Sequence, residues 1–239
     1  MSAPVLSPRL RLTGTWLTAC LIGCAHAADW QPMERAEARD GIRTWSRAVP
    51  GLAVKQFRGE TEVPHSVLAV LALLADVPGM KHWVFQCDGA MQPTGLPPDR
   101  MYLTFKGLWP ASPRDVLLRT RITQTADSVV HVVTQATEGM PVSDKHVRMP
   151  MLNNAFKLTP LPGEWTRIEF QTQVDLGGQV PTWLANLVST RAPLVTLQGI
   201  HARLPQPAYQ IRTTEPLPMH FYDGPKPFLP PGHLKPASP

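Results

Sequence analysis

Cysteine and charge are both scarce in this chain of 239 residues, which has 3 Cys and only 17% charged residues. Small folds held together by disulfides are far richer in cysteine, so that class is excluded. No run of eighteen apolar residues occurs, which excludes an ordinary membrane-spanning helix. Lysine and arginine outnumber aspartate and glutamate by 23 to 18 but form no basic block, so nothing indicates binding to nucleic acid.

Apolar residues make up 43% of the chain, enough for a globular domain with a buried core. Proline is frequent, with 27 residues, and ten of them fall within 205–239. This segment has no apolar period, so it predicts an extended tail after the folded domain. Partner proteins also recognise polyproline segments, which leaves open a role as an envelope adaptor.

The first 27 residues have the order of a secretory signal peptide. Arg9 and Arg11 supply the positive start, residues 12–23 are mostly apolar or small, and residues 25–27 (Ala-His-Ala) form a cleavage site. Export to the periplasm or out of the cell is therefore expected. Removing 27 of the 239 residues leaves 212 and lowers the formal charge from +5 to +3, because both arginines are lost.

The number of cysteines in the mature chain depends on where the leader is cleaved. Cys20 and Cys24 lie in the leader, so the mature chain would keep only Cys87, which is expected to be buried and unreactive. Residues 21–24 (Leu-Ile-Gly-Cys) also resemble the bacterial lipobox, in which Cys24 would become lipidated and hold the protein on a membrane. The order of the leader favours cleavage after Ala27.

Two segments in the first third of the chain have helical spacing. Residues 29–46 predict an amphipathic N-terminal helix. Residues 66–76 predict a helix that is apolar nearly all round and is therefore buried or set over a pocket. Ser66 is a suitable N-cap, and the Pro-Gly pair at 78–79 ends this helix.

A longer helix is predicted over 181–204, where the opening proline suits the first turn. Its apolar stripe includes Trp183, Leu187 and Leu194 and is expected to face a ligand. Pro193 should bend the helix without ending it. One half of the helix could then act as a lid.

Between these helices the period of apolar residues changes to two. Strands are predicted over 53–62, 83–87, 101–106, 116–123, 129–137 and 167–176. In most of them apolar residues face one way and polar residues the other, which predicts an antiparallel sheet with one wet face. The fold class is α+β, with a curved sheet wrapped on the long C-terminal helix and an apolar cavity between them.

Residues 174–186 (Val-Asp-Leu-Gly-Gly-Gln-Val-Pro-Thr-Trp-Leu-Ala-Asn), followed by Pro193, resemble the C-terminal signature of START domains, the steroidogenic acute regulatory protein-related lipid-transfer family. Further matches occur in the family's order: Asp76 with Trp83, Trp109-Pro110 before Arg114-Asp115, and Val147-Arg148 before Asn153-Asn154. The resemblance covers 30–204. It implies a helix-grip START domain over 28–204, of a bacterial exported branch.

The resemblance also implies a function, a non-enzymatic carrier that binds a lipid or another apolar molecule in its cavity. Such a carrier needs no cofactor and no metal, acts as a monomer and touches membrane surfaces only transiently. The residues expected to contact the ligand are Asp88, Met101, Leu103, Phe105, Leu118, Thr120, Ile122, Val132, Met149, Met151, Asn153, Phe170, Thr172, Trp183, Leu187 and Leu194.

Two departures from the family pattern bear on the ligand. Val84 stands where the family usually has Asp. Sterol-binding members place an arginine in the cavity five residues after the Arg-Asp aspartate, and here Thr120 has that place. Arg119 and Arg121 fall on the opposite face of the strand, although a bulge could bring either one inward.

Motifs that carry chemistry do not occur in this sequence. No histidine pair has the spacing of a helical zinc site, and no serine sits in a nucleophile elbow. A cyclase- or hydrolase-type enzyme that uses the same cavity stays open as an alternative. It would need an acid–base pair, for which His131 with Asp88 is the candidate.

Overall fold

The computed structural model describes residues 29–49, 54–214 and Leu217, and ten strands in this part of the chain form one sheet. The strands are β1 (Gln31–Glu34), β2 (Arg43–Arg47), β3 (Gln56–Val63), β4 (Cys87–Met91), β5 (Arg100–Phe105), β6 (Arg114–Gln124), β7 (Val130–Ala136), β8 (Val147–Arg148), β9 (Met151–Leu161) and β10 (Trp165–Asp175). Their order across the sheet is β1-β2-β3-β10-β9-β7-β6-β5-β4, and β8 pairs with β6. Neighbours are antiparallel except for β6 and β8.

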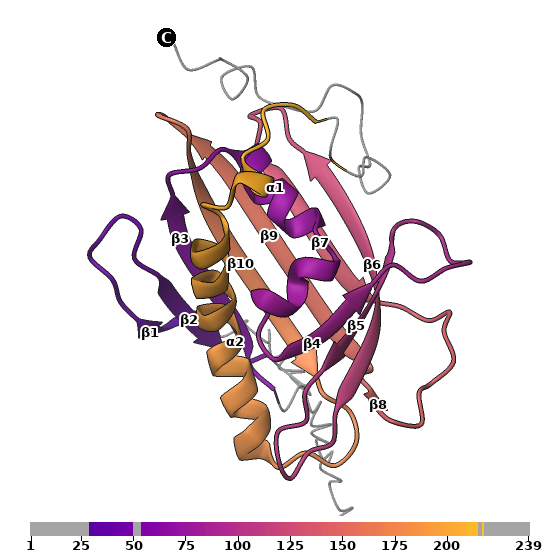
Figure 1. Cartoon of the computed structure of the whole chain (residues 1–239). Helices are drawn as coiled ribbons and strands as arrows, with labels where there is room; N and C mark the ends of the chain where they lie inside the picture. The colour runs from indigo at the N-terminus through magenta and orange to yellow at the C-terminus, as the bar shows by residue number, and fades with distance from the viewer. Residues whose placement is uncertain (1–28, 50–53, 215–216, 218–239) are drawn as a thin grey trace, which may run out of the picture.

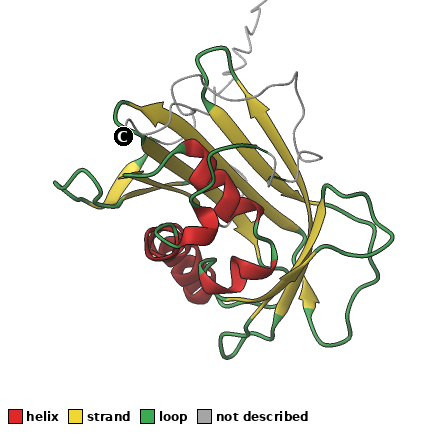
Figure 2. Cartoon of the chain, turned by 45° about the horizontal axis from the view of Figure 1, so that its top comes forward, coloured by secondary structure: helices red, strands yellow, loops and turns green. Residues whose placement is uncertain are grey.

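The helices lie on one face of this sheet. They are α1 (Val67–Ala75), the 3-10 helix η1 (Pro78–His82), α2 (Thr182–Arg203) and the 3-10 helix η2 (Pro207–Tyr209). The sheet curves around α1 and α2, and α2 runs beside β3 and β10 (Figure 1, Figure 2). The α+β helix-grip architecture predicted from the sequence is confirmed.

Strand β10 shows the predicted alternation most clearly. Ile168, Phe170 and Thr172 are buried toward the helices. Arg167 and Glu169 point to the outer face, where each forms an ion pair with an oppositely charged residue of β3. The two-residue period therefore separated the core face from the wet face correctly.

Helix α1 is buried on nearly all sides, as its composition predicts. Its N-cap is Ser66, whose hydroxyl accepts a hydrogen bond from the amide of Ala69 at 3.3 Å. The helix ends at Asp76, whose carboxylate accepts from the amide of Gly79 at 3.1 Å. This cap turns the chain directly into η1, which brings Met80 to the core.

The N-terminal segment is not helical. The prediction of a helix over 29–46 is wrong, because β1 and β2 form here at the edge of the sheet. Burial alternates along β2, where Thr44 and Ser46 are buried. Arg43 pairs with Glu60 of β3 at 2.9 Å. Charges that fit the polar face of a helix instead pair across neighbouring strands.

The strand predicted over 83–87 is also wrong. Residues 83–86 form an irregular turn after η1, and β4 begins only at Cys87. Gln86 has a φ of 56°, in the left-handed region that strands do not use. The turn is held to α2 by the amide of Phe85, which donates to Oγ1 of Thr196 at 3.3 Å. A short apolar run fits a strand and a buried turn equally well.

Helix α2 continues through Pro193, as predicted. Pro193 is buried against Gly59 of β3. A Cβ at position 59 would lie 3.3 Å from the proline Cβ and 2.6 Å from a methyl group of Leu197. The glycine therefore lets the C-terminal half of α2 approach the sheet closely.

The C-terminal segment packs on the domain at its start, which differs from the extended tail predicted over 205–239. Tyr209 of η2 is buried, and its hydroxyl donates to the carboxylate of Asp76 at 2.8 Å. Leu217 is buried as well. Residues 218–239 and the signal peptide expected over 1–27 lie outside the described residues.

Candidate functional site

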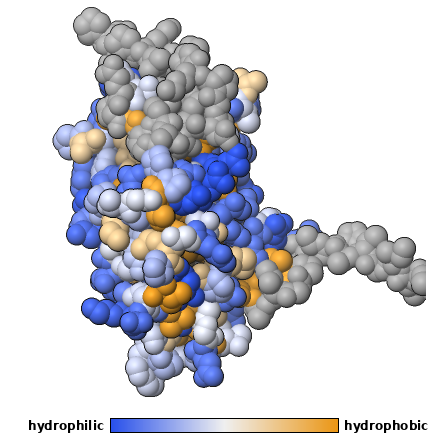
Figure 3. Space-filling view, turned by 90° about the vertical axis from the view of Figure 1, so that its right-hand side faces the viewer, coloured by the Kyte–Doolittle hydropathy of each residue, from blue (hydrophilic) through white to orange (hydrophobic). Residues whose placement is uncertain are grey.

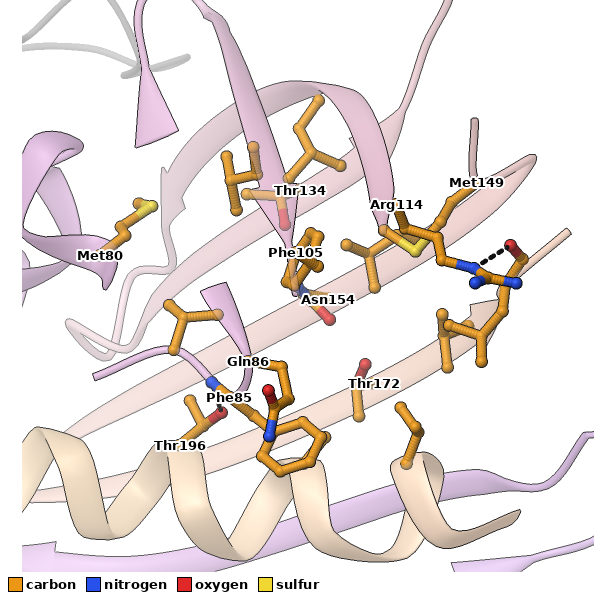
Figure 4. A pocket seen from close by; sticks show the side chains of 18 of the residues that line it. Met80, Phe85, Gln86, Phe105, Arg114, Thr134, Met149, Asn154, Thr172 and Thr196 are labelled. Atoms are coloured by element: carbon orange, nitrogen blue, oxygen red, sulfur yellow. Dashed lines mark hydrogen bonds between the residues drawn. The ribbon is translucent and has the colours of Figure 1, made fainter. Parts of the chain in front are cut away.

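A pocket lies between the concave face of the sheet and α2. The centres of water-sized molecules can occupy about 140 Å³ of it. That is roughly ten times the space needed by one buried water. The view in Figure 4 shows side chains from the sheet, from α2 and from the turn at 83–86 pointing into this space.

Five strands build the floor of the pocket with the side chains that face inward. The floor residues are Met101, Leu103 and Phe105 of β5, Leu118 and Thr120 of β6, Val132 and Thr134 of β7, Leu152, Asn154 and Phe156 of β9, and Phe170, Thr172 and Val174 of β10. The rings of Phe156 and Phe170 are stacked with their centroids 4.4 Å apart. The floor is thus mostly apolar, as in most ligand sites, with a few polar groups.

One face of α2 forms the opposite wall. Its residues recur at every fourth position, namely Leu184, Val188, Ala192 and Thr196. Phe85 and Gln86 from the turn before β4 complete this wall, and Figure 4 shows both close to Thr196. Because side chains four apart lie on one side of a helix, a single face of α2 meets the pocket.

Among the described residues that line the pocket, only Lys106 and Arg114 are charged. The Arg114 guanidinium is held by backbone carbonyls, donating to Leu176 at 3.4 Å, to Gly177 at 3.5 Å and to Ser112. Burial lowers the pKa of Arg114. These bonds tie the loop before β6 to the loop before α2 at one end of the pocket.

The neighbouring Asp115 points away from the pocket. It is 0% exposed and binds Arg148 through both carboxylate oxygens, at 2.8 and 3.1 Å, and its Oδ2 also accepts from Tyr102 at 2.6 Å. Burial alone would raise the pKa of this carboxyl, but the hydrogen bonds from Arg148 and Tyr102 prevail and lower it. This cluster fastens β8 to β6 and stands apart from any ligand.

Three polar atoms of the lining are buried without a hydrogen-bond partner in the protein. They are Nε1 of Trp83, Oγ1 of Thr120 and Oδ1 of Asn154. Most buried polar groups in proteins are paired, so these three unpaired atoms on pocket-lining residues are the groups that a ligand could satisfy.

Nine of the residues predicted to contact the ligand line the pocket. They are Met101, Leu103, Phe105, Leu118, Thr120, Val132, Met149, Phe170 and Thr172. All except Met149 lie on strands whose two-residue period was clear in the sequence. The alternation of apolar and polar residues was therefore enough to predict which side chains of these strands face inward.

The prediction fails on α2, where the stripe of Trp183, Leu187 and Leu194 does not face the pocket. Trp183 is 59% exposed and Leu187 is 41% exposed. The sequence-based prediction took the face with the largest apolar residues to be the buried one. In the structure, the face with Leu184 and Val188 meets the pocket instead. The signal for this face in the sequence was the regular spacing of four residues from Leu184 to Thr196.

Four more predicted residues lie outside the pocket. Asp88 is exposed, because the pairing of β4 with β5 shifts register between Cys87 and Gly89. Ile122 lies farther along β6 than the pocket reaches. Met151 and Asn153 have the parity of the outer face of β9, where Leu152, Asn154 and Phe156 face inward. The resemblance placed a strand near Asn153, but no alternation was recognised there, so the parity of β9 was not available.

Arg119 and Arg121 both lie on the outer face of β6, as the parity of the strand predicts. Arg119 donates to Asp99 at 2.9 Å. Neither arginine lines the pocket, whereas Thr120 between them does. The side of the molecule seen in Figure 3 is mostly hydrophilic, with separate hydrophobic patches.

Metal-binding and membrane-spanning features are absent from the part of the chain that the structure describes. No group of three or more His, Cys, Asp or Glu could hold a metal ion there. Within the same residues, no helix has both the length and the apolar character to cross a bilayer.

A curved antiparallel sheet that grips a long C-terminal helix over an apolar pocket defines a helix-grip protein. The family model of the START domain matches residues 23–204, and the chain belongs to this family. It is 30% identical to the uncharacterized protein PA1579 of Pseudomonas aeruginosa over 198 residues, which covers 79% of this chain and 94% of that protein.

Solved structures with the same fold are similar over most of the domain. The STAR-related lipid transfer protein of Xanthomonas axonopodis is 26% identical, with a TM-score of 0.66, and the match covers 74% of this chain and 99% of the other. Human StAR-related lipid transfer protein 5 is 16% identical, with a TM-score of 0.61, and the match covers 72% and 85%.

Proposed function

We propose that the protein binds a lipid in this pocket and carries it without chemical change. The observation behind the proposal is the character of the lining, which is mostly apolar and includes no carboxylate, imidazole or thiol among the described residues. The Xanthomonas relative is named a lipid transfer protein, which is in keeping with this proposal.

Apolar burial is a sufficient driving force for such binding. A ligand that loses roughly 300 Å² of apolar surface gains about 7 kcal/mol at about 25 cal/mol per Å². Part of that gain is offset by the lost freedom of the two partners. No acid, base or nucleophile is needed for this step.

An enzyme of the cyclase or hydrolase type has less support. Its acid–base pair was expected from His131 and Asp88, and neither residue lines the pocket. Asp88 is exposed, and His131 pairs in register with Lys157 on the outer face of the sheet. The two ionisable lining residues, Lys106 and Arg114, are both cationic and cannot form such a pair with each other.

Transfer requires contact with a membrane, and we assign this role to the end of the pocket where two loops meet. Leu108 and Leu184 line the pocket there. Next to them Trp109 is 89% exposed and Trp183 is 59% exposed. Exposed tryptophans prefer the interface of a bilayer. The first half of α2 would move as a lid, while its second half stays held near Gly59.

Export through residues 1–27 remains part of this proposal, as does action as a monomer. A mature chain starting at Ala28 would be a soluble shuttle with weak attraction to anionic bilayers. Lipidation of Cys24 would make it a tethered carrier instead. Mass spectrometry of the protein isolated from its native cells distinguishes the two forms by the mass of the N-terminal peptide.

The test of the proposal is extraction of the purified mature protein with organic solvent, followed by mass spectrometry. A stoichiometric lipid, together with transfer of that lipid between donor and acceptor vesicles, is the expected result. A protein that is repeatedly empty and does not accelerate transfer would show that the pocket is not a lipid site.

A further inference from the structure

Four polar side chains lie at one level across the floor of the pocket, one on each of four neighbouring strands. They are Thr120 of β6, Thr134 of β7, Asn154 of β9 and Thr172 of β10. Thr120 is directly opposite Thr134, Thr134 opposite Asn154, and Asn154 opposite Thr172 in the register of the sheet. Directly opposite residues are cross-strand neighbours, so these four form a continuous polar row. Figure 4 shows three of them, Thr134, Asn154 and Thr172.

The polar row is bordered by apolar residues on both sides. On one side of the polar row, the next inward-facing residues along the strands form the cross-strand pairs Leu118–Ala136 and Leu152–Val174. On the other side, the next inward-facing residues are also directly opposite their neighbours in the register of the sheet. They are Ile122, Val132, Phe156 and Phe170. A ligand lying along the pocket therefore meets apolar wall, then the polar row, then apolar wall again.

Two members of the row are buried without a partner in the protein. Oγ1 of Thr120 and Oδ1 of Asn154 have no hydrogen bond, and Thr120 is only 4% exposed. A valine at 120 would fill the same space and favour a strand equally well without burying a hydroxyl. Packing and strand propensity therefore do not account for the threonine.

Charge is absent from this level of the pocket. The charged lining residues are Lys106 and Arg114. Arg114 lies six residues from Thr120 along β6, which is roughly 20 Å of extended strand. An anionic group held at the polar row would have no cation beside it, and burying it there would be costly.

We propose that the ligand carries an uncharged hydrogen-bond donor, such as a hydroxyl, partway along an otherwise apolar body, and that Thr120 and Asn154 recognise this group. The inference rests on the proposed lipid-carrier function and specifies the chemistry of its ligand. Oδ1 of Asn154 accepts from the ligand, and the Thr120 hydroxyl can either accept or donate. Apolar segments on the two sides of the donor fill the two apolar bands.

The test compares two neutral probes with one carbon skeleton, methyl 12-hydroxystearate and methyl stearate. Each displaces diphenylhexatriene, a pure hydrocarbon fluorophore, from the mature protein. We expect the hydroxylated ester to bind about tenfold more tightly, the effect of one or two neutral hydrogen bonds in a buried site. Equal affinity of the wild-type protein for the two esters would overturn the inference without any variant being needed.

Variants locate the preference within the pocket. Thr120→Val and Asn154→Leu should each remove most of it while leaving the affinity for methyl stearate unchanged or higher. Thr123→Val, on the exposed face of the same strand, and Asn153→Leu, at the outward position before Asn154, are the matched controls and should keep it. Loss of the preference in the controls as well would overturn the assignment to the polar row.

Failure of this inference differs from failure of the carrier proposal. If diphenylhexatriene and both esters bind but are not distinguished, the pocket is a lipid site with no polar recognition. If the fluorophore and both esters fail to bind a folded protein, the carrier proposal itself falls, and this inference falls with it.

Discussion

Gly199 of α2 touches the backbone of Trp83 so closely that a side chain would not fit between them. A Cβ at position 199 would lie 2.5 Å from the carbonyl oxygen and 2.7 Å from the Cα of Trp83. Both atoms belong to the backbone of the turn that forms part of the pocket wall. This contact and the one at Gly59 fix the C-terminal half of α2 at two points, on the turn and on the sheet.

The substitution Gly199→Ala should therefore destabilise the protein. In an exposed helix the same change stabilises by about 1 kcal/mol. Here the methyl group would push α2 away from the turn, and we expect a loss of about 1–3 kcal/mol. Thermal unfolding measures it, at roughly 2–4 °C per kcal/mol for a domain of this size. Gln198→Ala, at the exposed neighbouring position, is the control and should be nearly neutral.

Breaking the ion pair of Asp115 with Arg148 should destabilise the protein more than Gly199→Ala does. Asp115→Asn leaves the partly buried Arg148 without its anion. Because Asp115 itself is fully buried, we expect a loss of about 3 kcal/mol. Glu164→Gln removes an exposed pair with Arg212 and should cost less than about 1 kcal/mol. Chemical denaturation of the two variants measures the difference, and equal losses would contradict the assigned role of Asp115.

The stability of the protein should also depend on pH through the carboxylate of Asp115. The pKa of Asp115 is lowered in the folded protein, so its contribution is complete above the unfolded value of about 4 and is lost as pH falls through the folded value. Wild-type stability should therefore decline below about pH 4. Asp115→Asn should show a smaller decline over the same range, measured by urea unfolding at several pH values. An equally steep decline would assign the acid sensitivity to other carboxylates.

Much of this fold could be predicted from local patterns. Alternation gave the faces of β6 and β10, and the Ser66 cap and continuous apolar sequence gave α1. The N-terminal strands could not be predicted in this way, because Arg43 of β2 pairs with Glu60 of β3, which lies outside the local pattern. The turn at 83–86 likewise depends on the close approach of Gly199, which no local pattern encodes.

The site could be predicted only where strand parity was already known. Thr120 was identified because both its neighbours are arginines, which marks the inward position on β6. Asn154 was missed in favour of Asn153, since nothing local identified β9 or its pairing with β7 and β10. The inward face of α2 depends on how the helix lies across the sheet, which is a property of the whole fold.

Cys87 should be inert in the folded protein. Burial raises the pKa of its thiol to about 11, so very little thiolate exists at pH 8. In the mature chain from Ala28, where it is the sole cysteine, we expect reaction with Ellman's reagent to be about a hundredfold slower than in urea-unfolded protein. Fast stoichiometric labelling of the native protein would mean that the turn next to Cys87 opens readily.

Two neighbouring positions on α2 should separate ligand binding from membrane contact. Val188 lines the pocket, whereas Leu187 points to solvent beside Trp183. Val188→Asp places a carboxylate against the ligand, so the affinity for diphenylhexatriene should fall about tenfold or more. Leu187→Asp should leave that affinity within about twofold but slow lipid transfer to anionic vesicles several-fold, because the exposed apolar contact is replaced by a charge of the same sign as the bilayer. If Leu187→Asp instead abolishes binding and Val188→Asp does not, the stripe expected from the sequence faces the ligand after all, and α2 turns when the pocket is filled.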